Sequence, residues 1–241
     1  MTKSVVILGV GVSNGVGGAL ARRFASEGFH AIVSGRTPEK IEAVVEEVKA
    51  GGGLAEAVRA DVTSADDQDA LFEVVASRGE VAAVLYNAGN NAIIPFEQLD
   101  AQTYEAFWRV GNFGAFLTAK RAIPILRAQG EGSLFFTGAS GSCRGRANFA
   151  HFASMKAGLR MLAQSLSREF GPAGVHVAHF IIDGVINGDM VRGKYGEYLD
   201  TLGEDGSLSP DAIAEAFWHV HTQHRSAWTH EMDLRPYKET W

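Results

Sequence analysis

The stretch that decides the fold is 5–18, which reads VVILGVGVSNGVGG. Its first four residues are apolar, as expected of a strand covered on both faces in a parallel sheet. The glycines that follow allow a tight turn, and residues 15–27 have the apolar spacing of a helix. Such a turn aims the unpaired N–H groups of the helix start at one point, where they favour a bound phosphate. By itself a glycine-rich turn is a weak signal, because many of them bind nothing.

Apolar and helical stretches alternate along the rest of the chain. The predicted strands are 5–8, 31–33, 54–58, 81–85, 134–136 and 175–178. The predicted helices are 15–27, 38–50, 65–78, 103–128, 149–170 and 210–221. Right-handed crossovers join such elements into a doubly wound parallel sheet. We therefore expect a single Rossmann-like α/β domain over residues 1–241, with ligands bound beyond the carboxyl ends of the strands.

Composition narrows the class of protein. A chain of 241 residues suits one large domain and is marginal for two. Hydrophobic residues at 46% and charged residues at 21% are ordinary for a folded protein. The formal charge of −6 disfavours nucleic acid or an anionic membrane as the main partner, so we expect a small-molecule substrate.

Cysteine and histidine usage predicts neither disulfides nor a metal site. The single cysteine, Cys143, excludes an internal disulfide and fits a reducing compartment. The first apolar stretch is too short for a signal peptide or a membrane span, so a cytoplasmic protein is expected. Of the clustered histidines, His219 and His221 lie on nearly opposite faces of the predicted helix, so no metal is expected.

The residues after the second predicted strand indicate which nucleotide the turn would hold. An acidic side chain about twenty residues beyond the glycines usually binds the ribose hydroxyls of NAD(H). This chain has Ser34-Gly35-Arg36-Thr37 instead. Arg36 offers a planar fork for a 2′-phosphate, and no carboxylate stands there to repel it. The sequence therefore predicts NADP(H) as the preferred cofactor, with NAD(H) possible.

Taken together, these motifs resemble the short-chain dehydrogenases/reductases over nearly the whole chain. Gly11, Gly15 and Gly17 are similar to the family's TGxxxGxG turn, with Val10 at the usual threonine. The segment 86–89, YNAG, resembles the family's NNAG. Lys156 occupies the lysine position of the family's YxxxK motif.

The resemblance implies a set of cofactor contacts and an assembly. Asp61 and Val62 correspond to the pair that contacts the adenine ring in the family. Asp183-Gly184 stands where the family has the Pro-Gly that bounds the nicotinamide pocket. By the same resemblance, the helix bearing Phe107 and Trp108 packs across a dimer interface, which implies a homodimer or homotetramer. The full set of implied cofactor-binding residues is Gly11, Ser13, Asn14, Gly15, Val16, Gly17, Arg36, Asp61, Val62, Asn87, Ala88, Gly89, Lys156, Asp183, Gly184 and Ile186.

The implied catalytic residues are Asn112, Ser140 and Lys156, with Phe152 at the position of the family's tyrosine. That tyrosine gives or takes the substrate proton, which a phenylalanine ring cannot do. The family's partner serine falls on Ala139 or Ser140. The tyrosines of this chain are Tyr86, Tyr104, Tyr195, Tyr198 and Tyr237, so the helix bearing Lys156 holds none.

Several groups are candidates for the missing proton donor. Water held by Asn112 and Lys156 itself rank first, followed by Asp183 and Ser140. His151 is disfavoured, because its helical position next to Phe152 turns it about a hundred degrees away, toward a surface or an interface.

The irregular stretch 184–209 follows a predicted strand and is expected to be the substrate loop, a lid over the ligand. The favoured function is an NADP(H)-dependent oxidoreductase acting on a carbonyl, an alcohol or an activated alkene. The alternatives are a nucleotide-binding sensor or scaffold that has lost its chemistry, and a structural protein that uses the fold without a cofactor.

Overall fold

A computed structural model describes residues 2–240 of the chain. At its centre lies a seven-stranded sheet in the order β3-β2-β1-β4-β5-β6-β7, and every neighbouring pair is parallel. The strands are β1 Ser4–Leu8, β2 His30–Gly35, β3 Leu54–Arg59, β4 Val81–Tyr86, β5 Ser133–Thr137, β6 His176–Ile182 and β7 Glu231–Leu234. The expected Rossmann-like sheet is confirmed, with one further short strand, β7, at its edge.

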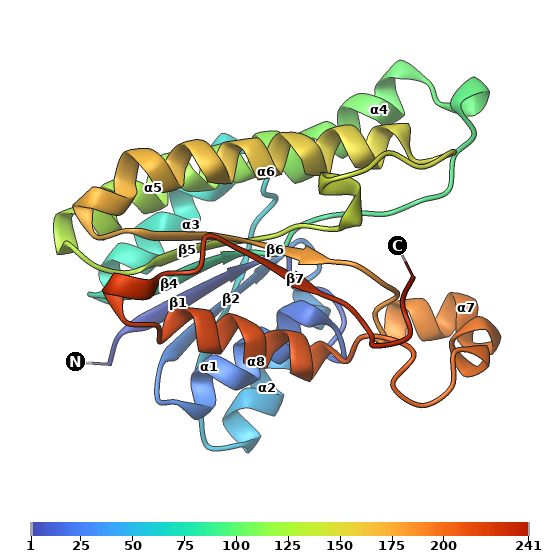
Figure 1. Ribbon diagram of the computed structural model, residues 1–241. Helices are drawn as coiled ribbons and strands as arrows, with labels where there is room; N and C mark the ends of the chain where they lie inside the picture. The colour runs from blue at the N-terminus through green and yellow to red at the C-terminus, as the bar shows by residue number, and fades with distance from the viewer. Residues whose placement is uncertain (1, 241) are drawn as a thin grey trace.

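Helices cover both faces of this sheet (Figure 1). They are α1 Val16–Ser26, α2 Pro38–Ala50, α3 Ala65–Ser77, α4 Ala101–Trp108, α5 Gly114–Gln129, α6 Ala150–Phe170, α7 Asp189–Thr201 and α8 Pro210–His221. The short turns are 3-10 helices η1 Phe96–Gln98, η3 Ser140–Ser142, η4 Gly171–Ala173 and η5 Arg225–Ala227, and the π-helical turn η2 Arg109–Phe113.

Two apolar layers hold the helices onto the sheet. Val5 and Ile7 of β1 belong to the layer under α1, α2 and α8, whereas Val6 and Leu8 belong to the layer under α3, α5 and α6. This alternation follows from the two-residue period of a strand. Because each buried aliphatic side chain contributes roughly 1.5–3 kcal/mol, the apolar residues at every position of β1 after Ser4 fix the strand in the centre of the sheet.

The predicted single helix over 103–128 is wrong in one respect. The π-helical turn η2 separates α4 from α5. The Tyr86 hydroxyl donates a hydrogen bond to the Val110 carbonyl oxygen, and a Cβ on Gly114 would lie 2.5 Å from that hydroxyl. A side chain that binds a helix carbonyl from outside disturbs the regular hydrogen-bond ladder, which explains the wider turn here.

The predicted irregular stretch 184–209 is also partly wrong, because α7 lies within it. This helix has few buried residues and a non-helical backbone at Tyr195, so it lacks the apolar periodicity from which a helix is predicted. Its start is attached to the glycine-rich turn: the Asp189 N–H donates to the Asn14 carbonyl at 3.0 Å, and the Asn14 amide donates to the Asp189 carboxylate at 2.9 Å.

Candidate active site

The candidate site lies where β1, β4 and β5 end. Directly after β1, Gly9 has a φ of +85°, and a Cβ there would overlap the backbone of Ala88. The Asn87 N–H donates to the Leu8 carbonyl at 2.9 Å, and the Asn87 amide donates to Gly9 at 3.2 Å. A glycine is therefore required at position 9 for the ends of β1 and β4 to meet.

The glycine-rich turn leads into α1, which begins at Val16 after the cap residue Gly15. The space that a Cβ on Gly11 would occupy is open, whereas a Cβ on Gly17 would lie 3.0 Å from the Cα of Val10. No side chain of the first turn, Val16, Gly17 and Gly18, is acidic. Open space in front of a helix start without nearby carboxylates on that helix suits a phosphate, so the turn fits a dinucleotide.

Two predicted contact residues of this turn already have partners. The Ser13 hydroxyl donates to a Glu47 carboxylate oxygen, and Arg22 donates to the Ser13 hydroxyl and carbonyl oxygens at 3.1 Å. Asn14 holds the start of α7, as described above. Ser13 and Asn14 therefore organise the turn through their neighbours on α2, α1 and α7.

From the glycine-rich turn a chain of hydrogen bonds leads to Lys156. The Thr137 hydroxyl donates to the Asn87 amide oxygen at 3.1 Å, and the Lys156 ammonium donates to the Thr137 carbonyl at 2.7 Å. A Cβ on Gly89 would lie 3.3 Å from the Lys156 nitrogen. Asn87 and Gly89 come from one predicted motif and Lys156 from another, and the structure brings them together.

Burial sets the electrostatics of Lys156. Its side chain is only 5% exposed, and this desolvation lowers the pKa of Lys156 to about 8. The ammonium form still predominates at neutral pH, with one strong hydrogen bond to a carbonyl. A buried cation connected to the glycine-rich turn is suited to hold a hydroxyl-bearing ligand such as a ribose.

Phe152 and Phe149 form an apolar wall beside this cation. The Lys156 nitrogen lies 5.9 Å from the centre of the Phe152 ring, and the Phe149 and Phe152 rings are 6.4 Å apart in an edge-to-face arrangement. A Cβ on Gly141 would lie 3.0 Å from two carbons of the Phe152 ring. As expected from their spacing, Phe149, Phe152 and Lys156 lie on one side of the helix, where two aromatic rings stand beside one ammonium group.

Of the two positions expected for the family's partner serine, only Ser140 carries a hydroxyl. Ala139 is buried at the start of η3, and Ser140 is half-buried. Asn112 lies in the π-helical turn η2, where its side chain is so close to Gly158 that a Cβ there would overlap it. The turn brings Asn112 against α6 at Gly158, which follows Phe152 by about one and two-thirds helical turns.

The residues expected around the adenine end lie at the ends of β2 and β3. Arg36 is exposed directly after β2. Asp61 accepts hydrogen bonds from the Thr63 N–H at 2.9 Å and hydroxyl at 2.8 Å, and Val62 is buried. These residues share the carboxyl edge of the sheet with the glycine-rich turn.

Asp183 lies at the other side of the site, just after β6. Its buried carboxylate accepts hydrogen bonds from Arg144 at 3.1 and 3.4 Å and lies 3.7 Å from Arg235. The next residue, Gly184, has a φ of +147°, and a Cβ there would lie 2.7 Å from Pro236. Sequence reasoning missed Arg144 and Arg235, because no local spacing links them to Asp183.

Ile186, the last of the predicted cofactor-binding residues, forms an isolated parallel β-bridge with Leu208.

The sequence predicts that His151 points toward a surface or an interface, and the structure corrects this expectation. Its ring is 1% exposed and packs edge-to-face on Phe107, with 4.3 Å between the ring centres. The contact between α4 and α6 turns this side chain inward. Within residues 2–240, no three His, Cys, Asp or Glu side chains gather as a possible metal site.

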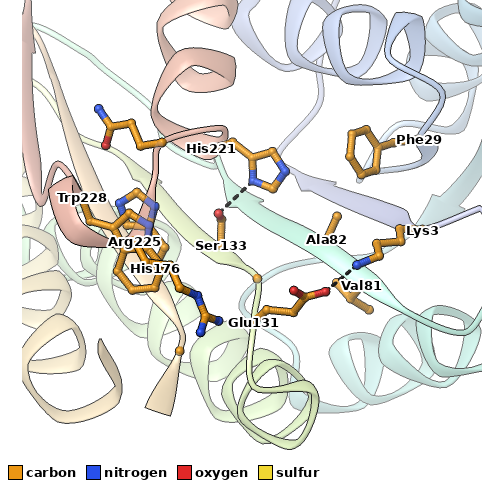
Figure 2. Close-up of a pocket in the computed structure, with 13 residues that line it drawn as sticks. Lys3, Phe29, Val81, Ala82, Glu131, Ser133, His176, His221, Arg225 and Trp228 are labelled. Carbon is orange, nitrogen blue, oxygen red and sulfur yellow. Dashed lines mark hydrogen bonds and ion pairs between the residues drawn. The ribbon is translucent and has the colours of Figure 1, made fainter. Parts of the chain in front are cut away.

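A cavity of about 380 Å³ lies at the opposite, amino edge of the sheet (Figure 2). His221 and Ser133 share a hydrogen bond of 2.9 Å there, and the His176 ring stacks on Trp228 at 4.5 Å. None of the predicted site residues lines this cavity. The residues that the sequence singles out therefore lie away from this cavity.

Comparison with known proteins agrees with the fold. Residues 4–197 match the short chain dehydrogenase family. An uncharacterized oxidoreductase of Bacillus subtilis, YuxG, is 30% identical over 216 residues, or 88% of this chain, which spans only 31% of that protein's length. A short-chain dehydrogenase from Rhodopseudomonas palustris is 32% identical, with 98% of this chain and 99% of that chain covered and a TM-score of 0.84. A metagenomic short-chain oxidoreductase in complex with NADP is 25% identical over 97% of each chain, with a TM-score of 0.83.

The chain therefore belongs to the short-chain dehydrogenase family, whose members are NAD(P)-dependent oxidoreductases. Across the part of the chain that the structure describes, no helix is both long and apolar enough to span a membrane.

Proposed function

We propose that the protein is an NADP(H)-dependent oxidoreductase that transfers hydride between the nicotinamide and a small carbonyl, alcohol or activated alkene. The observation that carries this proposal is the buried Lys156 ammonium, 2.7 Å from the Thr137 carbonyl and connected through Asn87 to the glycine-rich turn. Placing a cation in a buried site costs free energy, and this cost is understandable if the cation binds a ligand.

The chain's own residues then have distinct tasks. The N–H groups at the start of α1 bind the pyrophosphate, Lys156 binds the nicotinamide ribose, and Arg36 binds the 2′-phosphate of NADP(H). When bound, the nicotinamide supplies or accepts the hydride. The support for NADP(H) is the exposed guanidinium after β2, together with the NADP bound to the metagenomic relative.

The proton requires a separate route, because Phe152 has none to give. The Thr137 hydroxyl already donates to Asn87. We propose that water held near Asn112, or the Lys156 ammonium with its pKa lowered to about 8, supplies the proton. Loss of a positioned acid typically costs a hundred- to ten-thousand-fold in rate, so slow but measurable turnover is expected.

The first test is calorimetric titration of the purified protein with NADPH and NADH. The second is turnover with NADPH against a panel of ketones, aldehydes and enones. Lys156→Ala should abolish turnover and weaken NADPH binding, whereas Lys120→Ala, which removes an exposed lysine of α5, should change neither. Absence of binding by either nucleotide would refute the proposal.

Phe152 and Ala139 favour a second function, a sensor or scaffold that binds NADP(H) without chemistry. Under this alternative the protein binds NADPH but oxidises it with no member of the panel. Steady turnover that disappears in Lys156→Ala would exclude the alternative.

A further inference from the structure

Behind the turn that follows β5, four side chains from four different elements form a continuous chain of hydrogen bonds. We call Ser142 of η3, His179 of β6, Glu231 of β7 and Arg160 of α6 the Ser142 network. The Ser142 hydroxyl lies 3.3 Å from His179 Nε2, and His179 Nδ1 lies 3.1 Å from a Glu231 carboxylate oxygen. Arg160 donates to both oxygens of Glu231 at 2.7 Å.

The chemistry of the partners determines the direction of each hydrogen bond. A carboxylate only accepts, so His179 Nδ1 carries a proton and donates it to Glu231. Because burial lowers the pKa of His179 to about 4, the ring is neutral at pH 7 and Nε2 is an acceptor for the Ser142 hydroxyl. The Ser142 oxygen in turn accepts the Ala139 N–H at 3.2 Å. The chain of bonds therefore runs from a backbone N–H of the turn to a guanidinium on α6.

The turn that this network holds touches the candidate active site. Ser142 and Ala139 bracket Ser140 and Gly141, and Gly141 lies directly against the Phe152 ring. The His179 ring occupies the space that a side chain at position 138 would need, so Gly138 lets the two strands approach. The preceding carbonyl, that of Thr137, is bound by Lys156. The turn is thus held by α6 on one side and by β6 on the other.

The two members nearest the turn, Ser142 and His179, are too deeply buried to contact a substrate. His179 is fully buried and Ser142 is 5% exposed. The order Ser–His–Glu is also found among the catalytic groups of hydrolases. Here, however, Ser142 is only 5% exposed and its hydroxyl oxygen accepts the Ala139 N–H, so a substrate cannot reach it for nucleophilic attack.

We propose that the Ser142 network is a positioning device, which fixes the turn of residues 139–142 and thereby places Ser140 and the Phe152 ring beside the hydride acceptor. Its effect on the chemistry rests on the proposed function, but its effect on the turn does not. Ser142, His179 and Glu231 are therefore positioning residues, and they act through the turn.

Ser142→Ala tests the network at its first bond. The variant removes the acceptor of the Ala139 N–H, so hydrogen exchange of that amide should become about tenfold faster, in keeping with one lost hydrogen bond. Cys143 is the only cysteine and is exposed, so its reaction with a thiol reagent reports on the same turn. This reaction should also become faster, while the Kd for NADPH stays within about twofold and kcat falls about fivefold.

Glu231→Gln tests whether a change at the other end of the Ser142 network affects the turn, since the hydrogen bonds of Glu231 go to His179 and Arg160. Faster exchange of the Ala139 amide in this variant would show that the effect passes through His179. The matched control is His176→Gln, which changes another buried histidine of β6 whose partner is the Thr229 carbonyl at 2.9 Å. This control should leave the Ala139 amide and Cys143 unchanged.

The proposal is overturned if folded Ser142→Ala keeps the Ala139 exchange rate and the Cys143 reactivity of the parent. It is also overturned if the turn loosens and an active enzyme keeps its kcat. If the turn loosens and the parent protein turns over no substrate, the positioning of the turn is supported and the proposed function fails.

Discussion

At the scale of single residues, the site combines a retained cation with a missing hydroxyl. Lys156 is buried, hydrogen-bonded to Thr137 and connected to the glycine-rich turn, in keeping with the cofactor role proposed for it. Phe152 occupies the neighbouring position on the same helical face, and its ring has no proton to exchange. The contrast suggests that nucleotide binding is preserved while proton transfer follows another path.

Phe152→Tyr should raise the rate of carbonyl reduction by about ten- to a hundredfold, because it restores a hydroxyl beside Lys156. Steady-state kinetics with NADPH and a ketone would measure this effect. Phe149→Tyr is the matched control, since it adds a hydroxyl at the cap residue that precedes α6, and it should give no such gain. An unchanged or lower rate for Phe152→Tyr would mean that the proton path does not pass through this position.

Arg36→Ala should weaken NADPH binding by about tenfold or more and leave NADH binding nearly unchanged, because only NADPH carries the 2′-phosphate. Calorimetric titration with both nucleotides would give the ratio of the two dissociation constants. Arg59→Ala is a suitable control, because Arg59 ends the adjacent strand β3 and is paired with Asp67 at 3.2 Å. Equal losses for both nucleotides in Arg36→Ala would contradict the assignment.

At the scale of elements, local pattern predicted most strands and helices but not their interruptions. The apolar runs of β1 and β4 and the spacing in α1 and α6 are visible in the sequence because each is a repeat within one segment. The π-helical turn η2 depends on Tyr86, which belongs to a different strand. The start of α7 depends on Asn14, which is 175 residues away. Contacts between distant segments leave no periodic trace.

The junction of β1 and β4 provides a test of one such contact. Gly9→Ala combines a positive φ with overlap on Ala88, so it should lower the free energy of unfolding by about 3 kcal/mol or more. Gly28→Ala is its control, because Gly28 has nearly the same φ, +87°, but open space around it. The control should cost only about 1 kcal/mol. Denaturant unfolding of both variants would measure the difference, and equal losses would show that the overlap is relieved without cost.

At the scale of the whole molecule, two histidines at different places link folding to pH: His179 is fully buried, and His221 is half-buried. His179 lies behind the candidate site, whereas His221 lies beside the cavity at the amino edge, among the rings of Phe24, Phe29 and Trp218. Burial lowers the pKa of both histidines to about 4. The fold therefore holds both rings in the neutral form.

Acid should destabilise the protein for this reason. In the unfolded chain a histidine binds its proton near pH 6.5, but in the folded protein it does so only near pH 4. Stability is complete above pH 6.5 and falls toward pH 4, by up to about 3 kcal/mol for each histidine. Urea unfolding at pH 7.5, 6 and 5 would show the decline. His179→Gln or His221→Gln should flatten this pH dependence, and His219→Gln, which changes an exposed histidine, should not.

The sequence by itself determined the alternation of strands and helices, the glycine-rich turn and the helical face shared by Phe149, Phe152 and Lys156. Each of these depends on residues close together in the chain, where periodicity and backbone sterics act directly. Only the tertiary structure decided that Asp183 meets Arg144, that His151 points inward and that Ser142 is linked to Glu231 through His179. These contacts join segments that are neighbours only because the strands follow the order β3-β2-β1-β4-β5-β6-β7. That order is set by the packing of the whole sheet, and no short segment of sequence carries it.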